Sequence, residues 1–443
     1  MAFSLHGIKV PHRKNTADMP AVRIKTPETV TLPMAMHIGK PAIPCVKVGD
    51  TVFVGTLIGE QDGFVSSPVY SSVSGKVIKI ADTVLSSGAS CAAVTIESDG
   101  EMTPDPALQP PVIENREDML EAIRKSGMVG LGGAGFPTYV KFNVKNPIEE
   151  LVINGAECEP YITSDSLTMT SRADDMALAI SMLEKFFNIN KVIIGIEKNK
   201  PAAIASMLSL AEKDPKISVK SLPSVYPQGG EKVLVYHTTG KKIGRGKLPI
   251  DVGCVVCNCT TVASIGAYIK TGMPFVEKCI TVDGSAVKEP KNVIVPIGTS
   301  LGYVFDACGG FKDEPAKIIY GGPMMGISVP DADQPVLKNT NAILAFNEKD
   351  SVLPEETACI KCGTCLNNCP FGLSSCAISK AYKNKDAAAL EKLGVDLCME
   401  CGCCSYGCPA GRPLVQTNRL AKAFLREEKE KAKAAEKAKE ANK

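Results

Sequence analysis

The sequence predicts a multidomain protein that joins α+β and α/β parts to a cysteine-rich helical module near its end. Three observations lead to this prediction. A chain of 443 residues is too long for one hydrophobic core and should divide into three or four domains. Its middle part alternates strand-like and helix-like segments, as parallel α/β sheets do. Finally, ten of its 18 cysteines fall between Cys359 and Cys408.

The composition narrows the class of protein. The chain is 44% hydrophobic and 22% charged, which is typical of a soluble globular protein. Its formal net charge of +2 provides no basic field for nucleic acid. No apolar run approaches the roughly 18 residues of a spanning helix, and the first ten residues lack the apolar stretch of a signal peptide. We therefore expect a cytoplasmic protein that reaches a membrane only through partners.

The N-terminal part is predicted to be a β domain behind a short leader. Residues 1–30 are polar and broken by prolines, so we expect an extended lead-in. Residues 31–103 are rich in Val, Ile, Thr, Gly and Pro, with strand-like runs at 51–58 and 75–80. The two similar halves of this segment resemble the barrel-sandwich domain of biotinyl and lipoyl carriers. The lysine that such carriers modify is missing, which favours a structural or docking role.

A proline-rich linker leads into residues 112–271, where the hydrophobic pattern changes. Asn115 can cap a helix that ends at Gly127. Predicted strands and helices then alternate along the segments 151–154, 172–187, 191–196, 201–212 and 217–222. This alternation predicts a parallel α/β sheet.

Three further segments follow the predicted sheet domain. Residues 272–345 return to short strands separated by glycine-containing turns, which predicts a compact α+β module. Residues 350–416 contain the dense cysteines. Residues 417–443 form a charged, alanine-rich helix with almost no apolar face beyond three residues around Phe424, and we expect a solvated tail.

Two identical motifs occupy the cysteine-rich segment. Each reads C-x2-C-x2-C-x3-C-P, and the second begins about 40 residues after the first. Three closely spaced cysteines reach three irons of a 4Fe–4S cube, and in two-cluster ferredoxins the fourth cysteine of each run binds the other cluster. We therefore predict a ferredoxin-like domain with two 4Fe–4S clusters. The predicted ligands are Cys359, Cys362, Cys365 and Cys408 for one cluster, and Cys398, Cys401, Cys404 and Cys369 for the other.

A zinc site is the main alternative for these cysteines. Structural zinc sites typically combine two C-x2-C pairs rather than two sets of four with a C-x3-C-P ending, so the spacing favours iron and sulfur. Cys376 and Cys403 are left over and are interpreted as small buried residues or bystanders. A third metal site farther upstream is a minor alternative, because no complete cluster spacing is found among Cys158, Cys254, Cys257 and Cys259.

A glycine-rich segment at residues 130–138 contains the pattern G-x-G-x-x-G. Such a loop lets a phosphate approach backbone amides. The pattern alone is weak, because the dinucleotide fingerprint follows a strand and a predicted helix precedes it here. A glycine-rich turn without a ligand is the alternative. Polar segments at 154–160, 229–232 and 257–261 strengthen the nucleotide interpretation.

Together these segments resemble the flavin-binding, NADH-oxidising subunit of respiratory complex I. That family reads G-R-G-G-A-G-F-P-T at the loop, N-x-D-E-x-E-P after the strand, then G-E-E and N-N-V-E-T. The chain is more similar still to the RnfC subunits of the Rnf family, the membrane-bound ferredoxin:NAD oxidoreductases. These subunits add an N-terminal barrel-sandwich domain, a soluble-ligand-binding β-grasp module with a motif like residues 320–326, and two C-terminal clusters. The resemblance covers residues 30 to 415 approximately.

The resemblance implies FMN and NAD(H) as cofactors beside the two 4Fe–4S clusters. It places the nicotinamide nucleotide near Phe136, Glu159 and Lys232, and FMN near the other residues of the set. The implied cofactor-binding residues are Gly130, Gly132, Gly133, Gly135, Phe136, Lys141, Asn154, Glu157, Glu159, Gly230, Glu231, Lys232 and Asn258. Two positions depart from the family pattern: Leu131 stands where the family has Arg, and Lys232 replaces the second Glu of G-E-E. Solvated strand-end charges are the alternative for Glu157 and Glu159.

Nicotinamide exchanges two electrons at once, whereas an iron–sulfur cluster moves one, and a flavin does both. The resemblance therefore implies a peripheral NAD-dependent oxidoreductase subunit of an ion-pumping complex, with no catalytic side chain of its own. It would lie on the cytoplasmic face of the membrane, against the membrane subunits and the ferredoxin-accepting subunit. Two alternatives stay open: a two-cluster electron relay without a catalytic flavin, and the NADH-oxidising subunit of a complex I-like quinone reductase.

Overall fold

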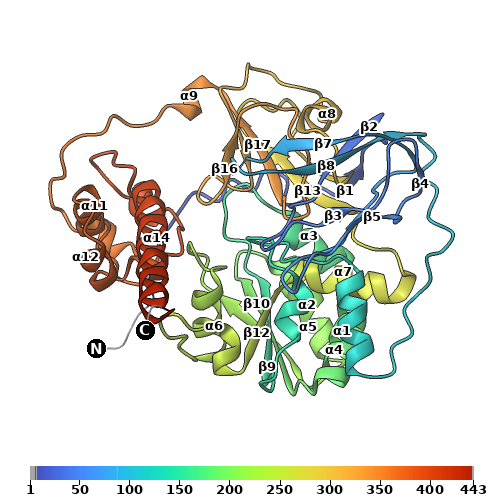
Figure 1. The fold of residues 1–443 in the computed structure, drawn as a ribbon, viewed down its shortest axis with the longest axis horizontal. Helices are drawn as coiled ribbons and strands as arrows, with labels where there is room; N and C mark the ends of the chain where they lie inside the picture. The colour runs from blue at the N-terminus through green and yellow to red at the C-terminus, as the bar shows by residue number, and fades with distance from the viewer. Residues whose placement is uncertain (1–4, 6, 87, 442–443) are drawn as a thin grey trace.

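The computed structural model describes residue 5, residues 7–86 and residues 88–441. Strands of the described residues form four sheets, two small ones near the N-terminus, one parallel sheet and one six-stranded sheet. Figure 1 shows the C-terminal helices α11, α12 and α14 to one side of these sheets. The chain therefore divides into several folding units, as its length predicts.

The N-terminal unit is a pair of antiparallel sheets. The first consists of β2 (Thr29–Pro33), β8 (Ser90–Ser98), β7 (Gly75–Val84) and β4 (Thr51–Val52), in that order, and the second of β3 (Ile43–Pro44), β5 (Leu57–Glu60) and β6 (Val69–Tyr70). The predicted single run at 51–58 is wrong. Residues 53–56 form a turn in which the Phe53 N–H donates to Thr56 Oγ1, so the chain passes from one sheet to the other.

The middle unit is a parallel sheet of four strands in the order β11-β10-β9-β12. The strands are β9 (Glu150–Gly155), β10 (Lys191–Glu197), β11 (Ile217–Leu222) and β12 (Cys254–Asn258). The surrounding helices are α1 (Arg116–Lys125), α2 (Thr138–Phe142), α3 (Ser164–Ser171), α4 (Ala173–Phe187), α5 (Pro201–Ala211), α6 (Glu231–Thr239), the short 3-10 helix Pro249–Val252 and α7 (Cys259–Thr271). The predicted parallel sheet is confirmed, and Asn115 caps α1 as predicted.

The order of strands in this sheet creates a switch point. From β9 the chain continues to β10 and β11 on one side, and it returns to β12 on the other side of β9. In open α/β sheets, ligands bind outside the carboxyl ends of the strands at such a point. The carboxyl ends of β9 and β12 are therefore the expected place for a ligand.

The six-stranded sheet follows in the chain and includes a strand from the lead-in. Its own strands are β13 (Glu277–Asp283), β14 (Lys291–Pro296), β15 (Lys317–Tyr320), β16 (Ile327–Val329) and β17 (Ala342–Phe346), with helix α8 (Leu301–Ala307). β1 (Ala21–Arg23) pairs in parallel with β14. The described part of the predicted lead-in thus contributes an edge strand, Ala21–Arg23, to this sheet. Residues 1–4 and 6 of the lead-in lie outside the described residues.

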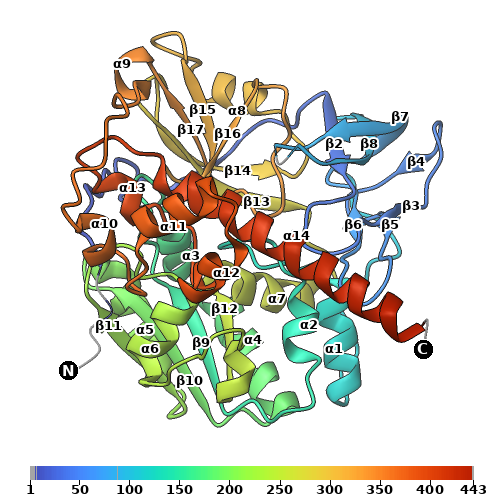
Figure 2. The same cartoon turned by 60° about the vertical axis from the view of Figure 1, so that its left-hand side comes forward.

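Helix α9 (Glu348–Ser351) follows β17 and contacts it. The C-terminal unit is made of helices: α10 (Thr364–Asn367), α11 (Ser375–Lys383), α12 (Ala387–Lys392), the 3-10 helix Val395–Leu397, α13 (Cys403–Tyr406) and the long α14 (Leu414–Ala441). Figure 2 shows α14 running from this unit across the front of the molecule. Among the described residues, no helix combines the length and apolar character needed to cross a membrane.

The prediction of a solvated C-terminal tail is partly wrong. Ala421 and Leu425 of α14 are buried in one cluster with Ile378 of α11 and Leu390 of α12. An apolar position every four residues is enough to seat the first turns of α14 on the two shorter helices. Residues 426–437 are mostly exposed, as predicted, and residues 442–443 lie outside the described part.

Lys338, between β16 and β17, joins three units of the chain. Its Nζ donates to the carbonyl oxygens of Pro68 at 2.6 Å and Gly127 at 2.8 Å, and lies 3.4 Å from Ser67 Oγ. The side chain is fully buried, and this burial lowers the pKa of Lys338 to about 7. A buried ammonium is costly unless its donors are used. The three acceptors therefore fix how the β domain, the α/β domain and the six-stranded sheet meet.

We expect Lys338→Met to destabilise the protein by about 2–4 kcal/mol, because the Pro68 and Gly127 carbonyls lose their donor in a buried site. The measurement is the midpoint of thermal unfolding of the full chain. Lys145→Met is the matched control, since Lys145 is exposed and its replacement should leave the midpoint nearly unchanged. Equal midpoints for the two variants would contradict the role given to Lys338.

Candidate nucleotide and cluster sites

The glycine-rich loop runs from the end of α1 to the start of α2. It is closed by the Gly130 N–H, which donates to the Phe136 carbonyl at 2.8 Å, and Gly135 adopts a left-handed φ of +71°. Gly132 and Gly133 are exposed, whereas Phe136 is partly buried. The loop is therefore exposed at Gly132 and Gly133, while hydrogen bonds hold its two ends in place.

Three other parts of the chain hold this loop. The Ile38 N–H of the β domain donates to the Gly135 carbonyl at 3.1 Å, and Asn339 Nδ2 donates to the Gly133 carbonyl at 3.2 Å. Lys278 Nζ donates to the Leu131 carbonyl at 3.2 Å. The Leu131 side chain is fully buried. Leu131, which stands where the family has Arg, thus packs into the core.

Asn154 and Asn258 lie side by side at the switch point. They are register partners at the carboxyl ends of β9 and β12. Asn258 Oδ1 caps α7 by accepting from the Thr260 N–H at 2.9 Å, and its Nδ2 donates to Asp165 Oδ2 at 2.7 Å. A methyl group added at Gly132 would come within 2.6 Å of Asn258 Nδ2. Glycine at 132 is therefore what lets the loop close over the end of β12.

The remaining FMN candidates surround the start of α6. Asn154 Nδ2 donates to the Gly229 carbonyl at 2.9 Å, next to Gly230, the residue before α6. Lys141 Nζ donates to the Val256 carbonyl at 2.8 Å and lies 3.8 Å from Glu231 Oε1. The structure thus brings the loop, both asparagines, Lys141 and Glu231 to one end of the sheet.

Lys232 lies apart from this group. Its Nζ donates to the Gly244 carbonyl at 3.2 Å, in the segment that follows α6. Lys232, which replaces the second Glu of the family's G-E-E, therefore binds a neighbouring loop through its ammonium group.

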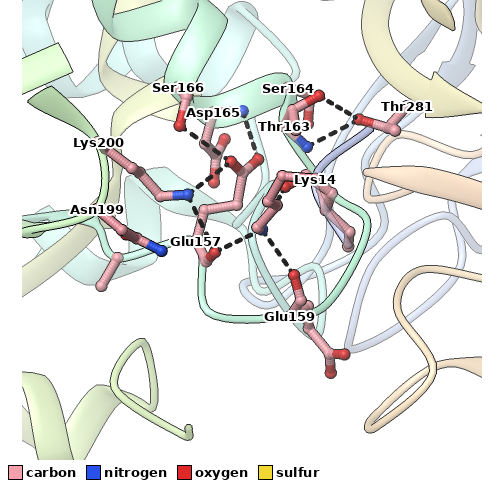
Figure 3. Close-up of polar contacts among 12 residues, drawn as sticks. Lys14, Glu157, Glu159, Thr163, Ser164, Asp165, Ser166, Asn199, Lys200 and Thr281 are labelled. Atoms are coloured by element: carbon pink, nitrogen blue, oxygen red, sulfur yellow. Dashed lines mark hydrogen bonds and ion pairs between the residues drawn. The ribbon is translucent and has the colours of Figure 1, made fainter. Parts of the chain in front are cut away.

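Glu157 is at the centre of a buried polar network, shown in Figure 3. Its Oε1 accepts from the Asp165 N–H at 2.7 Å, and its Oε2 lies 3.2 Å from Ser166 Oγ and 3.4 Å from Lys200 Nζ. Burial alone would raise the pKa of Glu157, but Lys200 and Lys14 hold it below its ordinary value. Glu157 is therefore a buried ion-paired carboxylate, and the alternative of a solvated strand-end charge is wrong for this residue.

Lys14, from the lead-in, organises the loop that carries both glutamates. Its Nζ donates to the main-chain carbonyls of Glu157 at 2.9 Å and Glu159 at 2.7 Å, and to that of Ile162 (Figure 3). Burial and the neighbouring Lys200 lower the pKa of Lys14 to about 8. Sequence reasoning missed both lysines, because nothing local in the lead-in or after β10 marks them as partners of this distant loop.

Glu159 reaches across to the six-stranded sheet unit. Its Oε1 accepts from the Met325 N–H at 2.8 Å and its Oε2 from the Met324 N–H at 3.1 Å. A methyl group at Gly322 would come within 2.2 Å of Glu159 Oε2. The glycine-rich motif at residues 320–326 is thus shaped to receive this carboxylate. Burial raises the pKa of Glu159 to about 7, although the two amides and Lys14 act in the opposite direction.

The two cysteine motifs have the same backbone conformation. Left-handed φ angles occur at Lys361 (57°) and Gly363 (78°) in the first motif, and at Glu400 (61°) and Gly402 (80°) in the second. Main chain in which right-handed and left-handed conformations alternate turns successive N–H groups toward one concave side. Such a concave side suits an anionic cluster. The repeated spacing in the sequence therefore corresponds to a repeated loop.

The fourth cysteine of each motif lies with the other motif. Four cysteines, called the first set, line a cavity of about 120 Å³: Cys359, Cys362, Cys365 and Cys408. Four others, the second set, line a smaller cavity of about 20 Å³: Cys369, Cys398, Cys401 and Cys404. Cys376 contributes to the first cavity and Cys403 to the second. The structure thus groups the eight predicted ligands as the sequence predicts.

The surroundings of the two sets differ. Cys359 and Cys362 are exposed, whereas Cys401 and Cys404 are buried. The second set is also approached by α14, where Asn418 Nδ2 lies 3.5 Å from Cys398 Sγ. The first set is therefore open to solvent at two of its four cysteines, whereas the second set has no exposed cysteine.

The residues at these sites fit the 4Fe–4S clusters and the FMN that the family resemblance implies. Four thiols around each cavity match a cube in which every thiolate binds a separate iron. Among the described residues, no group of three or more His, Cys, Asp and Glu side chains is placed to hold a single metal ion. At the switch point, the glycine loop, the two amides and the Lys141 ammonium supply the donors that a phosphate-bearing ring system requires.

Comparison with known families agrees with this division of the chain. Residues 3–101 match the RnfC barrel sandwich hybrid domain, residues 123–267 the Nuo51 FMN-binding domain, and residues 279–328 the SLBB domain. The predicted barrel-sandwich and FMN-binding domains are thus confirmed at the level of the family.

Similar proteins cover most of the chain. The C subunit of the Na+-translocating ferredoxin:NAD+ oxidoreductase complex of Acetobacterium woodii is 42% identical over 84% of this chain and 86% of its own length. The proton-translocating counterpart of Clostridium ljungdahlii is 41% identical over 83% and 81%. The C subunit of the ion-translocating oxidoreductase complex of Rhodobacter capsulatus is 37% identical over 96% and 84%. Among solved structures, an NAD+-reducing NiFe hydrogenase chain is 18% identical, with a TM-score of 0.49, over 70% of this chain and 63% of its own.

The raised pKa of Glu159 predicts a pH dependence of stability. The folded chain binds this proton with a pKa of about 7, against an ordinary value of 4.5. Between these values the folded state holds more protons than the unfolded state, so its stability falls as the pH rises. Glutamine does not titrate. Relative to Glu159→Gln, the wild-type protein should therefore lose up to about 3 kcal/mol between pH 5 and pH 8.

The measurement is the thermal midpoint of both proteins at the two pH values. Glu101→Gln, on an exposed turn, controls for the loss of one negative charge. Parallel pH profiles of the wild type and Glu159→Gln would show that Glu159 does not titrate in this range.

Proposed function

The chain belongs to the RnfC family of ion-translocating ferredoxin:NAD oxidoreductase complexes, and we propose that it passes electrons between two 4Fe–4S clusters and NAD(H) through FMN. Its relatives from Acetobacterium woodii and Clostridium ljungdahlii are C subunits of ion-translocating ferredoxin:NAD+ oxidoreductase complexes. We place this chain at the cytoplasmic face of the membrane as a peripheral subunit. Its proposed partners are the membrane subunits and the ferredoxin-accepting subunit.

The observation that carries the proposal is the position of Asn154, Asn258 and Gly132 at the switch point of the parallel sheet. A relay without a flavin would have no use for a glycine loop closed over the ends of β9 and β12. We propose that the exposed main chain at Gly132 and Gly133 binds the FMN phosphate, with Gly130 and Gly135 shaping the loop and Lys141 as the counter-charge. Asn154, Asn258, Gly230 and Glu231 would orient the ring system.

The two glutamates have different proposed roles. Glu157 is fully engaged within the protein, so its contribution is to hold the main chain after β9 in place. Glu159, together with Phe136 and Lys232, is proposed to border the nicotinamide site. The carboxylate of Glu159 is itself held by the amides of Met324 and Met325, so it would border that site as a fixed group.

We propose that the first and second cysteine sets each ligate one 4Fe–4S cluster. The exposure of Cys359 and Cys362 suits the first set to electron exchange with a neighbouring protein of the complex. The second set lies against the α/β domain, where Tyr226 contacts Cys401. The chain thus provides an outer and an inner cluster position between its surface and the flavin site.

The finer division of the chain follows from these roles. We assign residues 31–103 to the barrel-sandwich domain, 112–271 to the FMN and NADH domain, 272–345 to the β-grasp module, and 350–416 to the two-cluster domain. FMN, when bound, supplies the conversion between two-electron and one-electron transfer. The side chains of this protein bind and orient, and none is assigned as acid, base or nucleophile.

Anaerobic purification of the full chain tests the proposal directly. We expect about eight irons and one FMN per chain, and bleaching of the flavin absorbance on addition of NADH, because nicotinamide and flavin would lie in contact. Iron and released flavin are measured chemically, and the clusters by EPR. Eight irons without flavin, even after reconstitution with FMN, and without a response to NADH would leave only the two-cluster relay.

A matched pair of variants tests the flavin site. Asn258→Ala removes the cap of α7 and the amide beside Gly132, so we expect FMN affinity to fall about tenfold or more. Asn115→Ala removes the cap of α1 at the opposite end of that helix from the glycine loop, and it should retain wild-type FMN affinity. Each variant loses about 1 kcal/mol of stability from its cap.

The measurement for this pair is titration of flavin-depleted protein with FMN, followed by fluorescence. A similar loss of affinity in both variants would assign the effect to general destabilisation. Wild-type affinity in Asn258→Ala would exclude Asn258 from the site.

A further inference from the structure

Tyr226, in the segment between β11 and α6, connects the α/β domain to the second cysteine set. Its side chain is only 1% exposed. The hydroxyl donates to the main-chain carbonyl of Cys401 at 2.7 Å and lies 3.4 Å from Glu159 Oε1. Because a hydroxyl has one hydrogen, the shorter contact to Cys401 is the hydrogen bond. A buried side chain of the nucleotide domain thus donates directly to a residue of the second set.

The lead-in holds the main chain of Tyr226. The Ile8 N–H donates to the Tyr226 carbonyl at 2.8 Å, and the Tyr226 N–H donates to the Ile8 carbonyl at 2.9 Å. Ile8 and Val10 share a buried cluster with Tyr226, Cys401 and Cys403. Tyr226 is therefore held through its main chain by the pair of bonds to Ile8, and through its side chain by burial and the bond to Cys401.

Two further contacts seat the same cysteine loop. A methyl group at Gly230 would come within 2.1 Å of Met399 Cε, and one at Gly402 within 2.8 Å of the Met324 carbonyl. The loop from Met399 to Cys403 therefore fits closely between two other segments. Met399 lies against Gly230 at the start of α6, and Gly402 lies against Met324 of the 320–326 motif. The first set makes no comparable contact through Cys359 and Cys362, which are exposed.

We propose that Tyr226 is a positioning residue that fastens the second cysteine set to the nucleotide-binding domain and raises the reduction potential of the cluster held there. The inference rests on the proposed function, since it assumes that this set ligates a cluster. A reduced cluster carries one more negative charge than an oxidised one. The Tyr226 O–H bond points its positive end at the Cys401 main chain, beside a proposed cluster ligand. In a buried site this fixed dipole stabilises the more negative state and so raises the potential.

The direct test is Tyr226→Phe in the full chain, which removes the hydroxyl and keeps the ring. We expect about eight irons per chain to be retained. The midpoint potential of the second-set cluster should move to a more negative value, while that of the first-set cluster stays unchanged. The measurement is an EPR-monitored redox titration, and the signal of the second set is identified by its loss in Cys369→Ser.

Tyr406→Phe is the matched control, because Tyr406 lies between Cys404 and Cys408 in the sequence but is 53% exposed. It should leave both potentials unchanged. Eight irons with unchanged potentials in Tyr226→Phe would overturn the inference and leave the proposed function intact. Equal shifts of both clusters would also overturn it. A wild-type protein without two clusters would instead contradict the proposed function.

Ile8→Pro provides a second, independent variant. It keeps the Tyr226 side chain but removes the N–H that holds the Tyr226 carbonyl. A shift confined to the second-set cluster is expected here too, in the same direction. If Tyr226→Phe does not accumulate as folded protein, this variant decides the question, and an unchanged second-set potential in it overturns the inference.

Discussion

Two buried lysines and one partly buried lysine, each donating to main-chain carbonyls, hold the units of this chain together. Lys14, Lys278 and Lys338 each use two or more acceptors from loops that lie outside the strands and helices. Removing an ammonium from water is costly, and burial lowers the pKa of all three. The cost is offset only when the acceptors are all in place. Each lysine therefore couples the position of one loop to that of another, and neither loop is set independently.

The nucleotide site depends on this coupling. The glycine loop needs exposed main chain near the ends of β9 and β12, yet a glycine-rich segment loses more conformational entropy on ordering than any other. Lys278, through the Leu131 carbonyl, and Asn339, through the Gly133 carbonyl, supply the bonds that order it. Both donors come from the six-stranded sheet unit, whose residues 279–328 match the SLBB domain. That unit thus acts as a support for the loop of its neighbour.

The sequence was most informative where the signal is local. The cysteine spacing predicted two sets of four, and hydrophobic periodicity predicted the parallel sheet, because both depend on near neighbours in the chain. It was uninformative where the partner is distant. The residues near Lys14 do not indicate that its ammonium group donates to the Glu159 carbonyl. Those near Tyr226 do not indicate that its hydroxyl donates to the Cys401 carbonyl. The lead-in shows the same limit, since β1 is completed by a strand some 270 residues later.

The two cysteine motifs show how equal sequences acquire unequal environments. Their loops share the same left-handed positions, so the local chemistry offered to a cluster is nearly the same. The difference comes from what covers them. The second loop is enclosed by Tyr226, Met324 and α14, whereas Cys359 and Cys362 of the first stay open to solvent. Since cluster potentials depend on exposure and hydrogen bonding, burying one repeat of a symmetric module against the nucleotide domain is sufficient to make the two positions inequivalent. Under the proposed function, the pair of identical motifs would thereby form a relay with an outer and an inner end.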